Sequence, residues 1–295
     1  MQPLRLLVAF VLILLSTASG IASATNYTLW INGRSNSAGV AGDYNSFGYW
    51  GPASANAGIN KKSVNWDGYN SIASQNSKVR DALDCFCTGS NWCYIAVHDA
   101  GDLMMGYTLA NYGASARLKK NAVANSAGQC SNTDGGTQTG WNIKWVRVAG
   151  GAAGGSELSD YGSWSSTEPL VRDLKTTTAR AIYDHNNTRN VWFYNYAGAK
   201  GTLFASLLPG QDDEAVAYHS AGGVAGAAGT ALGNPADFFS NDLSLGTAAN
   251  EGGSVKWGFH SVVLRDDAET YNHYCNGNWQ GIVSPLRAAM ETYAK

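Results

Sequence analysis

Asp99 is the residue with the clearest chemical potential, because it stands at the tip of a tight turn. The apolar run Cys93–Val97 before it is typical of a buried strand. Behind the turn, apolar residues recur at helical spacing from Leu103 to Ala110. A strand, a turn of small residues and a helix together lift one side chain above the end of a sheet. A carboxylate held there could act as a nucleophile.

A carboxylate restricts the chemistry that such a turn can perform. Its attack on an ester carbonyl gives an anhydride, which is high in energy and reverts to the ester. Its attack on the saturated (sp³) carbon of an alkyl halide or epoxide gives an ester of the enzyme. A water molecule activated by histidine can then cleave that ester at the aspartate carbonyl. Asp99 therefore either changes the substrate class or ends catalysis.

The elements that must position this turn alternate between strand and helix patterns. The predicted strands are Tyr27–Asn32, Lys62–Trp66, Cys93–Val97, Asn142–Val148, Val191–Tyr196 and Trp257–Leu264. The predicted helices are Ser71–Phe86, a segment from Thr167 to about Tyr183, and Trp279–Tyr293, while 41–60 and 152–166 are predicted loops. This alternation predicts an α/β fold with a mostly parallel sheet and helices on both faces. Without a repeat or a linker, we expect a single domain over residues 25–295.

The turn and the residues after it resemble the α/β-hydrolase superfamily, in particular its secreted bacterial lipase- or esterase-like members. In that superfamily a nucleophile, an acid and a late histidine follow one another along the chain. The resemblance assigns these roles to Asp99, Asp213 and His273. Asp213–Val216 is similar to the loop that carries the acid, and His273 lies in a loop before the last predicted helix. The resemblance implies a single α/β-hydrolase-like domain that acts as a hydrolase on an ester-like or sp³-carbon electrophile.

Two departures from the superfamily lie in Val97-His98-Asp99-Ala100-Gly101, which stands where Gly-x-Ser-x-Gly is usual. Valine replaces the first glycine, and a carboxylate replaces the serine. The His-Asp-x-Gly pattern is similar to that of haloalkane dehalogenases and epoxide hydrolases, which use an aspartate nucleophile. Ala100 stands where those enzymes have tryptophan, which argues against a halide-binding role. The resemblance also implies that backbone N–H groups near Arg34 and Ala100 hold the oxyanion of the second step.

Other interpretations of these residues stay open. With an inactive carboxylate in the turn, the same fold would be a binding protein without catalysis. Ser220 lies in the elbow-like sequence Tyr218-His219-Ser220-Ala221-Gly222, and the protein would be an esterase if a histidine and an acid converge on it. Asp212 is adjacent to Asp213 and could equally orient the histidine, because that role needs only one carboxylate.

Three further titratable residues have structural interpretations. His98 adjoins the tip of the turn and is expected to support its geometry. His260 lies within a predicted strand and is expected to be a core residue. Asp102 is expected to be a first-turn carboxylate that the helix dipole favours.

The N-terminal residues have the pattern of an export signal. A cationic start at Met1–Arg5, an apolar run at Leu6–Leu15 and small residues at Ala22–Ala24 predict a signal peptide over residues 1–24. We therefore expect a secreted or periplasmic protein after cleavage near Ala24. The apolar run is too short to span a bilayer, so no stable membrane insertion is expected. A net charge of -2 offers no basic face, so no nucleic-acid partner is expected. The resemblance to α/β-hydrolases implies a small-molecule or polymer-ester substrate.

Five cysteines are disulfide candidates in an exported protein: Cys85, Cys87, Cys93, Cys130 and Cys275. Their number is odd, so one thiol is free or pairs outside the chain, and the sequence does not define the pairing. Cys85 and Cys87 lack the two-residue spacer and nearby histidines of a zinc site. No phosphate loop or metal-ligand spacing is present, so no cofactor is expected, and the oligomeric state is not predicted.

Overall fold

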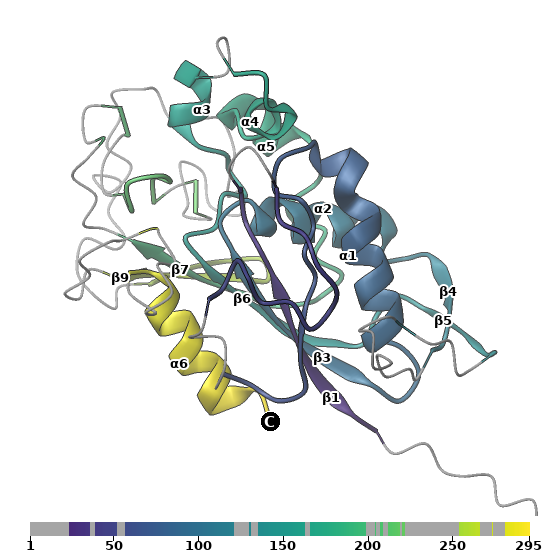
Figure 1. The fold of residues 1–295 in the computed structure, drawn as a ribbon. Coiled ribbons are helices and arrows are strands. Elements are labelled where there is room, and N and C mark those ends of the chain that lie inside the picture. Colours follow the sequence, from purple (N-terminus) through teal and green to yellow (C-terminus); the bar gives the residue numbers. More distant parts are fainter. Residues whose placement is uncertain are drawn as a thin grey trace, which may run out of the picture.

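A seven-stranded sheet forms the centre of the computed structural model, with the strand order β2-β1-β3-β6-β7-β9-β8 (Figure 1). The first six of these strands run parallel, and β8 pairs antiparallel with β9 at one edge. A separate two-stranded sheet pairs β4 with β5. The structure describes residues 24–35, 39–51, 57–120, 130, 135–162, 166–198, 204, 207–208, 212–218, 220–221, 254–265, 273 and 281–295.

The strands and helices alternate along the chain as the sequence predicts. The strands are β1 Asn26–Ile31, β2 Lys61–Ser63, β3 Trp92–His98, β4 Ala116–Leu118, β5 Thr137–Thr139, β6 Ile143–Ala149, β7 Phe193–Gly198, β8 Ser254–Trp257 and β9 His260–Arg265. The helices are α1 Ile72–Phe86, α2 Gly101–Tyr112, α3 Glu157–Gly162, α4 Pro169–Asp173, α5 Thr176–Ala181 and α6 Val283–Tyr293. The antiparallel pair of β4 and β5 has no counterpart among the predicted elements.

Helices cover both faces of the large sheet, because successive strand residues point to opposite sides. In β1, Leu29 and Ile31 enter the core shared with α1 and α2, whereas Trp30 enters the core shared with α6. In β3, Ile95 and Ala96 divide in the same way. Figure 1 shows α1 and α2 on one side of the sheet and α6 on the other. The predicted α/β fold with a mostly parallel sheet is therefore confirmed.

Helix α1 illustrates how local sequence defines an element. Ser71 caps it by accepting a hydrogen bond from the backbone N–H of Ser74. Near the helix end, disulfides join Cys85 to Cys130 and Cys87 to Cys93. The structure thus gives the pairing that the sequence left open for these four cysteines. Cys275 lies outside the described residues.

The expected helix from Thr167 to about Tyr183 is wrong, because it is broken into α4 and α5. Lys175 between them has an extended ψ of 137°. The carbonyl of Leu174 accepts a hydrogen bond from Ser156, and Thr176 donates from both its backbone and its hydroxyl to Asp160. These contacts with α3 and the residue before it replace helical hydrogen bonds at the break.

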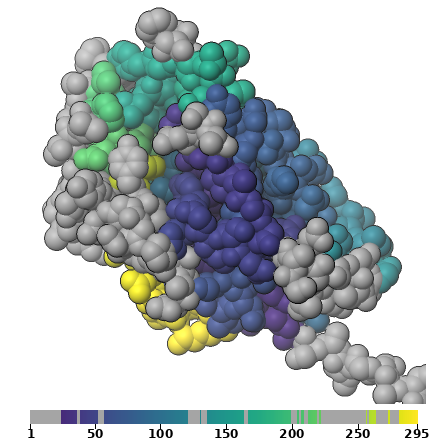
Figure 2. Space-filling model, viewed as in Figure 1, coloured from purple at the N-terminus to yellow at the C-terminus, as the bar shows by residue number. Residues whose placement is uncertain are grey.

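Helices α3, α4 and α5 gather beyond the carboxyl ends of the central strands (Figure 1). Their teal residues form the upper end of the molecule in the space-filling view (Figure 2). The predicted loop 152–166 thus contains one short helix, α3. The predicted strand Trp257–Leu264 is instead a hairpin, since the chain turns at Gly258, whose φ is +46°, between β8 and β9.

Most of the expected signal peptide, residues 1–24, lies outside the described residues. In the part of the chain that the structure describes, no helix has the length and apolar character needed to cross a bilayer.

Gly101, the first residue of α2, lies where α2 comes close to the end of β1. A Cβ there would lie 2.6 Å from the carbonyl oxygen of Asn32 and 2.9 Å from that of Ile31. We expect Gly101→Ala to destabilise the protein by roughly 1 to 3 kcal/mol, because backbone must move, although alanine is the better helix former. Thermal unfolding measures the change.

Gly48→Ala is the matched control, since nothing lies within 4 Å of a Cβ at that exposed position. It should alter stability by less than about 0.5 kcal/mol. Equal unfolding temperatures for the two variants would show that a methyl group at position 101 does not strain the packing.

Candidate active site

Asp99 occupies the turn between β3 and α2 in a left-handed conformation, with φ at +52°. Such a φ is uncommon outside glycine, and aspartate is among the residues that tolerate it best. Its backbone N–H donates to Ala149, and its carbonyl accepts from Asp102 and Ala152. The turn is therefore held on both sides, by the residues at the end of β6 and by the first turn of α2.

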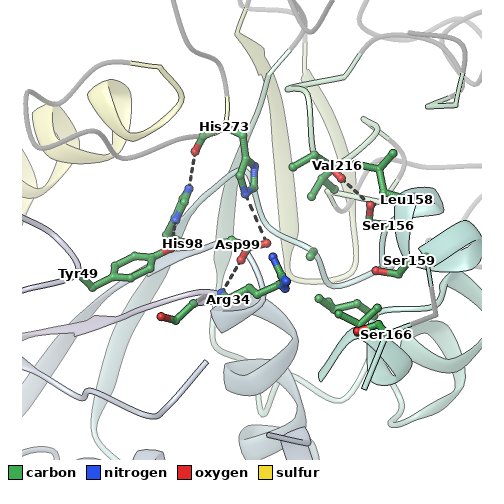
Figure 3. A pocket seen from close by; sticks show the side chains of 16 residues that line it. Arg34, Tyr49, His98, Asp99, Ser156, Leu158, Ser159, Ser166, Val216 and His273 are labelled. Atoms are coloured by element: carbon green, nitrogen blue, oxygen red, sulfur yellow. Dashed lines mark hydrogen bonds and ion pairs between the residues drawn. The ribbon is translucent and has the colours of Figure 1, made fainter. Parts of the chain in front are cut away.

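The carboxylate of Asp99 lies between the β1 loop and His273 (Figure 3). Its Oδ2 accepts a 2.6 Å hydrogen bond from the backbone N–H of Arg34, and its Oδ1 lies 3.5 Å from Nε2 of His273. Gly33 makes this approach possible, because a Cβ there would come within 2.5 Å of the Asp99 side chain. Asp99 is 7% exposed, so its carboxylate interacts mainly with protein groups.

Asp213 binds the opposite nitrogen of the same imidazole. Its Oδ2 lies 2.8 Å from Nδ1 of His273, and its Oδ1 accepts from the backbone N–H groups of Ala215 and Val216. Asp212 instead accepts from the backbone N–H of Glu214. The structure therefore brings Asp99, His273 and Asp213 into one line and directs Asp212 elsewhere.

Electrostatic interactions set the protonation states in this line of three groups. Burial alone would raise the pKa of Asp99, but the hydrogen bond and charge of His273, together with the Arg34 N–H, lower it below its usual range. Burial alone would lower the pKa of His273, but Asp213 and Asp99 raise it well above the usual value. These directions favour a positively charged imidazole between the two carboxylates.

His98 supports the site by contacting the main chain of His273. Its Nε2 lies 2.7 Å from the carbonyl oxygen of His273, so Nε2 carries a hydrogen and donates it. Its Nδ1 then accepts from the hydroxyl of Tyr49 at 2.5 Å. Burial and the nearby His273 lower the pKa of His98 to about 4, which is consistent with a neutral ring. Sequence reasoning did not identify Tyr49, because it lies in an aperiodic loop.

The two backbone groups expected to hold an oxyanion have different surroundings. The Arg34 N–H already binds Oδ2 of Asp99. Ala100 is buried and is the N-cap residue of α2, directly after the turn. The Arg34 side chain pairs with Glu168, at 2.6 Å from guanidinium to carboxylate.

A cavity of about 600 Å³ opens onto Asp99 and His273. Its polar lining includes the serines Ser35, Ser156, Ser159 and Ser166. Its aliphatic lining includes Leu158, Val171, Leu174 and Val216, mainly from the α3–α4 region and the Asp213 loop. Figure 3 shows the labelled members of this lining, among them Ser159, Ser166 and Leu158, around the space in front of Asp99. The cavity can therefore hold a small organic molecule beside the carboxylate.

Ser220 lies in a different environment. Its hydroxyl is buried, donates to Glu157 and accepts from Arg180, each at 3.3 Å. Of the histidines that the structure describes, none is hydrogen-bonded to it, and His219 lies outside the described residues. His260 is a buried residue at the start of β9, stacked on Phe193, as a core position predicts.

Asp102 differs from the expected dipole-stabilised carboxylate because it is almost fully buried. Burial raises its pKa to about 7, although the backbone N–H of Ala153 donates to it. Among the described residues, its Oδ2 has no hydrogen-bond partner. Desolvation therefore outweighs the helix dipole at this position.

No metal-binding group is found among the described residues, since no three or more histidine, cysteine, aspartate or glutamate side chains are placed to share an ion.

Comparison with known proteins relates the fold to bacterial lipases and esterases. No protein-family model matches the chain, and no curated protein matches its sequence. EstA from Clostridium botulinum is similar in structure, with a TM-score of 0.51 and 14% identity over 100% of this chain and 91% of that one. Lipase 1 from Pelosinus fermentans has a TM-score of 0.51 and 11% identity over 92% of this chain and 99% of that one. At these identities the likeness establishes the α/β-hydrolase fold alone.

The buried carboxyl group of Asp102 should make the stability of the folded protein depend on pH. Its pKa is about 7 in the folded protein against 3.8 for an unperturbed group, so the folded state retains a proton that the unfolded state releases. Stability from this group is therefore full below about pH 4 and is lost as the pH rises to about 7. Asp102→Asn should remove that loss, which is on the order of 1 to 4 kcal/mol.

The measurement is the difference in melting temperature between Asp102→Asn and the wild type across this pH range. The difference should move in favour of the variant from about pH 4 to about pH 7 and stay level above. A difference that does not vary with pH would contradict the raised pKa.

Proposed function

We propose that the chain is a hydrolase in which Asp99 is the nucleophile, His273 the base and Asp213 the acid that orients the histidine. The observation that supports this most directly is the position of Asp99 at the strained turn, with one oxygen on the Arg34 N–H and the other facing His273. The substrate we propose is a small electrophile with a reactive sp³ carbon, because a carboxylate attacking an ester carbonyl gives an unproductive anhydride.

In the proposed first step, Oδ1 of Asp99 attacks the sp³ carbon. The bond from that carbon to a halide or an epoxide oxygen breaks, and the leaving atom keeps the bonding electrons. Asp99 becomes a neutral ester and no longer holds the proton on His273 through its charge. The pKa of His273 therefore falls in this intermediate, and its Nε2 releases its proton to solvent, which leaves Nε2 free to act as a base. An epoxide oxygen that is released as an alkoxide takes up a proton from water.

In the proposed second step, Nε2 of His273 takes a proton from water as the water oxygen attacks Cγ of the ester. Negative charge develops on Oδ2, where the Arg34 N–H donates, with the Ala100 N–H as the proposed second donor. The bond from Cγ to Oδ1 then breaks, and the product alcohol leaves with Oδ1 and a proton from His273. Asp99 retains an oxygen that came from water.

A second candidate is a ligand-binding protein without catalysis. It is favoured by the engagement of both Asp99 oxygens and by the lowered pKa of the carboxylate, because a weakly basic, ion-paired carboxylate is a poor nucleophile. The lipase activity that the name of the Pelosinus fermentans protein states would then not extend to this chain.

Trapping of the ester distinguishes these candidates. With 1,2-epoxyhexane or 1-bromohexane, we expect His273→Gln to accumulate an alkyl ester on Asp99, because the first step needs only the carboxylate. Intact and peptide mass spectrometry measure the adduct, and Asp99→Asn should form none. After one wild-type turnover in heavy-oxygen water, the label should appear in Asp99 and not in the alcohol.

The opposite outcome is equally defined. If neither reagent alkylates the wild type or His273→Gln, the proposed nucleophile is wrong. If Asp99→Ser then gains activity on short-chain aryl esters, the site is an intact hydrolase framework without its nucleophile, and the binding protein becomes the better description.

Asp212 and Asp213 provide a matched pair for the orienting role. Of these two carboxylates, that of Asp213 contacts His273, whereas that of Asp212 accepts from the Glu214 N–H. We expect Asp213→Asn to slow hydrolysis of the ester by about a hundredfold or more, since it removes the charge that stabilises the histidine as it takes up a proton. Asp212→Asn should change this rate by less than about threefold. Rapid-quench mass spectrometry follows the decay of the ester, and equal effects in the two variants would exclude Asp213 from the role.

A further inference from the structure

His98 is a buried titratable residue to which the two steps above assign no part. It is the last residue of β3 and directly precedes Asp99. The residue is 3% exposed, and its ring lies 4.8 Å from the ring of His273, measured between centroids. Both of its nitrogens are used, one by the hydroxyl of Tyr49 and one by the main-chain carbonyl of His273.

His273 is therefore held at two separate points. Asp213 holds the side chain at Nδ1, which leaves the imidazole free to pivot about that hydrogen bond. His98 holds the backbone carbonyl of the same residue from the sheet. Together these contacts define both the position of the main chain and the direction in which Nε2 points. Neither contact alone defines both.

We propose that His98 is a positioning residue that fixes His273 against Asp99 through the hydrogen bond from its Nε2–H to the His273 carbonyl. This inference rests on the role of base proposed for His273. His98 also lines the cavity, but it contacts neither the substrate carbon nor the attacking water in the proposed steps, so we assign its effect on those steps to its contact with His273. Its loss therefore affects the water-dependent second step and not the alkylation of Asp99.

Tyr49 completes the arrangement by fixing the tautomer. Its hydroxyl donates to Nδ1 of His98, which keeps the hydrogen of the neutral ring on Nε2, where the His273 carbonyl accepts it. A proton on Nδ1 instead would leave a lone pair of Nε2 facing a carbonyl oxygen. Tyr49→Phe should have the smaller effect, because the carbonyl itself still favours the Nε2–H form.

Two substitutions at position 98 distinguish the effect of the hydrogen bond to the His273 carbonyl from the effect of the imidazole ring itself. The amide nitrogen of glutamine lies as far along the side chain as Nε2 of histidine, so His98→Gln can still donate to the His273 carbonyl. The amide of asparagine reaches only as far as Nδ1, so His98→Asn can contact Tyr49 but not that carbonyl. Both variants are polar and smaller than histidine, which makes each a control for the other.

Rapid-quench mass spectrometry with 1-bromohexane measures the two steps separately. His98→Asn should alkylate Asp99 at a rate within about twofold of the wild type and hydrolyse the ester at least about tenfold more slowly, because a small displacement of a catalytic group is costly. His98→Gln should recover most of the hydrolysis rate. Equal hydrolysis in wild type and His98→Asn, or equal loss in both variants, would overturn the proposal.

Proton NMR provides a readout that needs no substrate. The Nδ1–H of His273 in its bond to Asp213 should give a low-field signal that His273→Gln lacks. We expect the same signal in wild type and in His98→Gln, and a shifted or exchange-broadened signal in His98→Asn, because the imidazole can then pivot about its bond to Asp213. An unchanged signal in His98→Asn, or its loss in His98→Gln, would overturn the proposal. If Asp99 is never alkylated, the proposed function fails, and this comparison alone decides the role of His98.

Discussion

The left-handed turn at Asp99 is the constraint on which the rest of the site depends. At this one residue the chain passes from the central strand β3 to helix α2, with φ at +52°. Gly33 and Gly101 lie against it, where larger residues would collide with the side chain or with the end of β1. The strain of the turn is offset by hydrogen bonds to its own N–H and carbonyl. Because the turn is held on all sides, the direction of the carboxylate is fixed before any ligand binds.

A balance of charge is the second organising feature. The imidazole of His273 lies between the carboxylates of Asp99 and Asp213, each of which loses most of its hydration on burial. Two buried carboxylates without a cation would be strongly destabilising, and a positive charge on the histidine compensates both. A serine at position 99 would instead require a neutral histidine. The electrostatic environment of the site thus suits an acidic residue at the turn.

Some of this organisation was accessible from local patterns. The apolar run before Asp99, the capped helix from Ser71 and the alternation of strands and helices each depend on neighbours a few residues apart, and the structure confirms the fold that they predict. The predicted helix from Thr167 failed because its break depends on Asp160 and Ser156, which no local pattern connects to it. The burial of Asp102 was likewise invisible, since its polarity and helix position resemble those of an exposed first-turn residue.

By itself, the sequence determined the α/β class and the turn at Asp99, because periodicity and small residues act over short distances along the chain. A resemblance in chain order then nominated Asp213 and His273 without placing them. Only the tertiary structure decided that Asp213, and not Asp212, reaches the histidine, that Ser220 lies with Glu157 and Arg180, and that His98 holds the His273 carbonyl. These contacts join residues far apart in the chain, and they arise from the packing of strands and loops at one end of the sheet, which no single segment encodes.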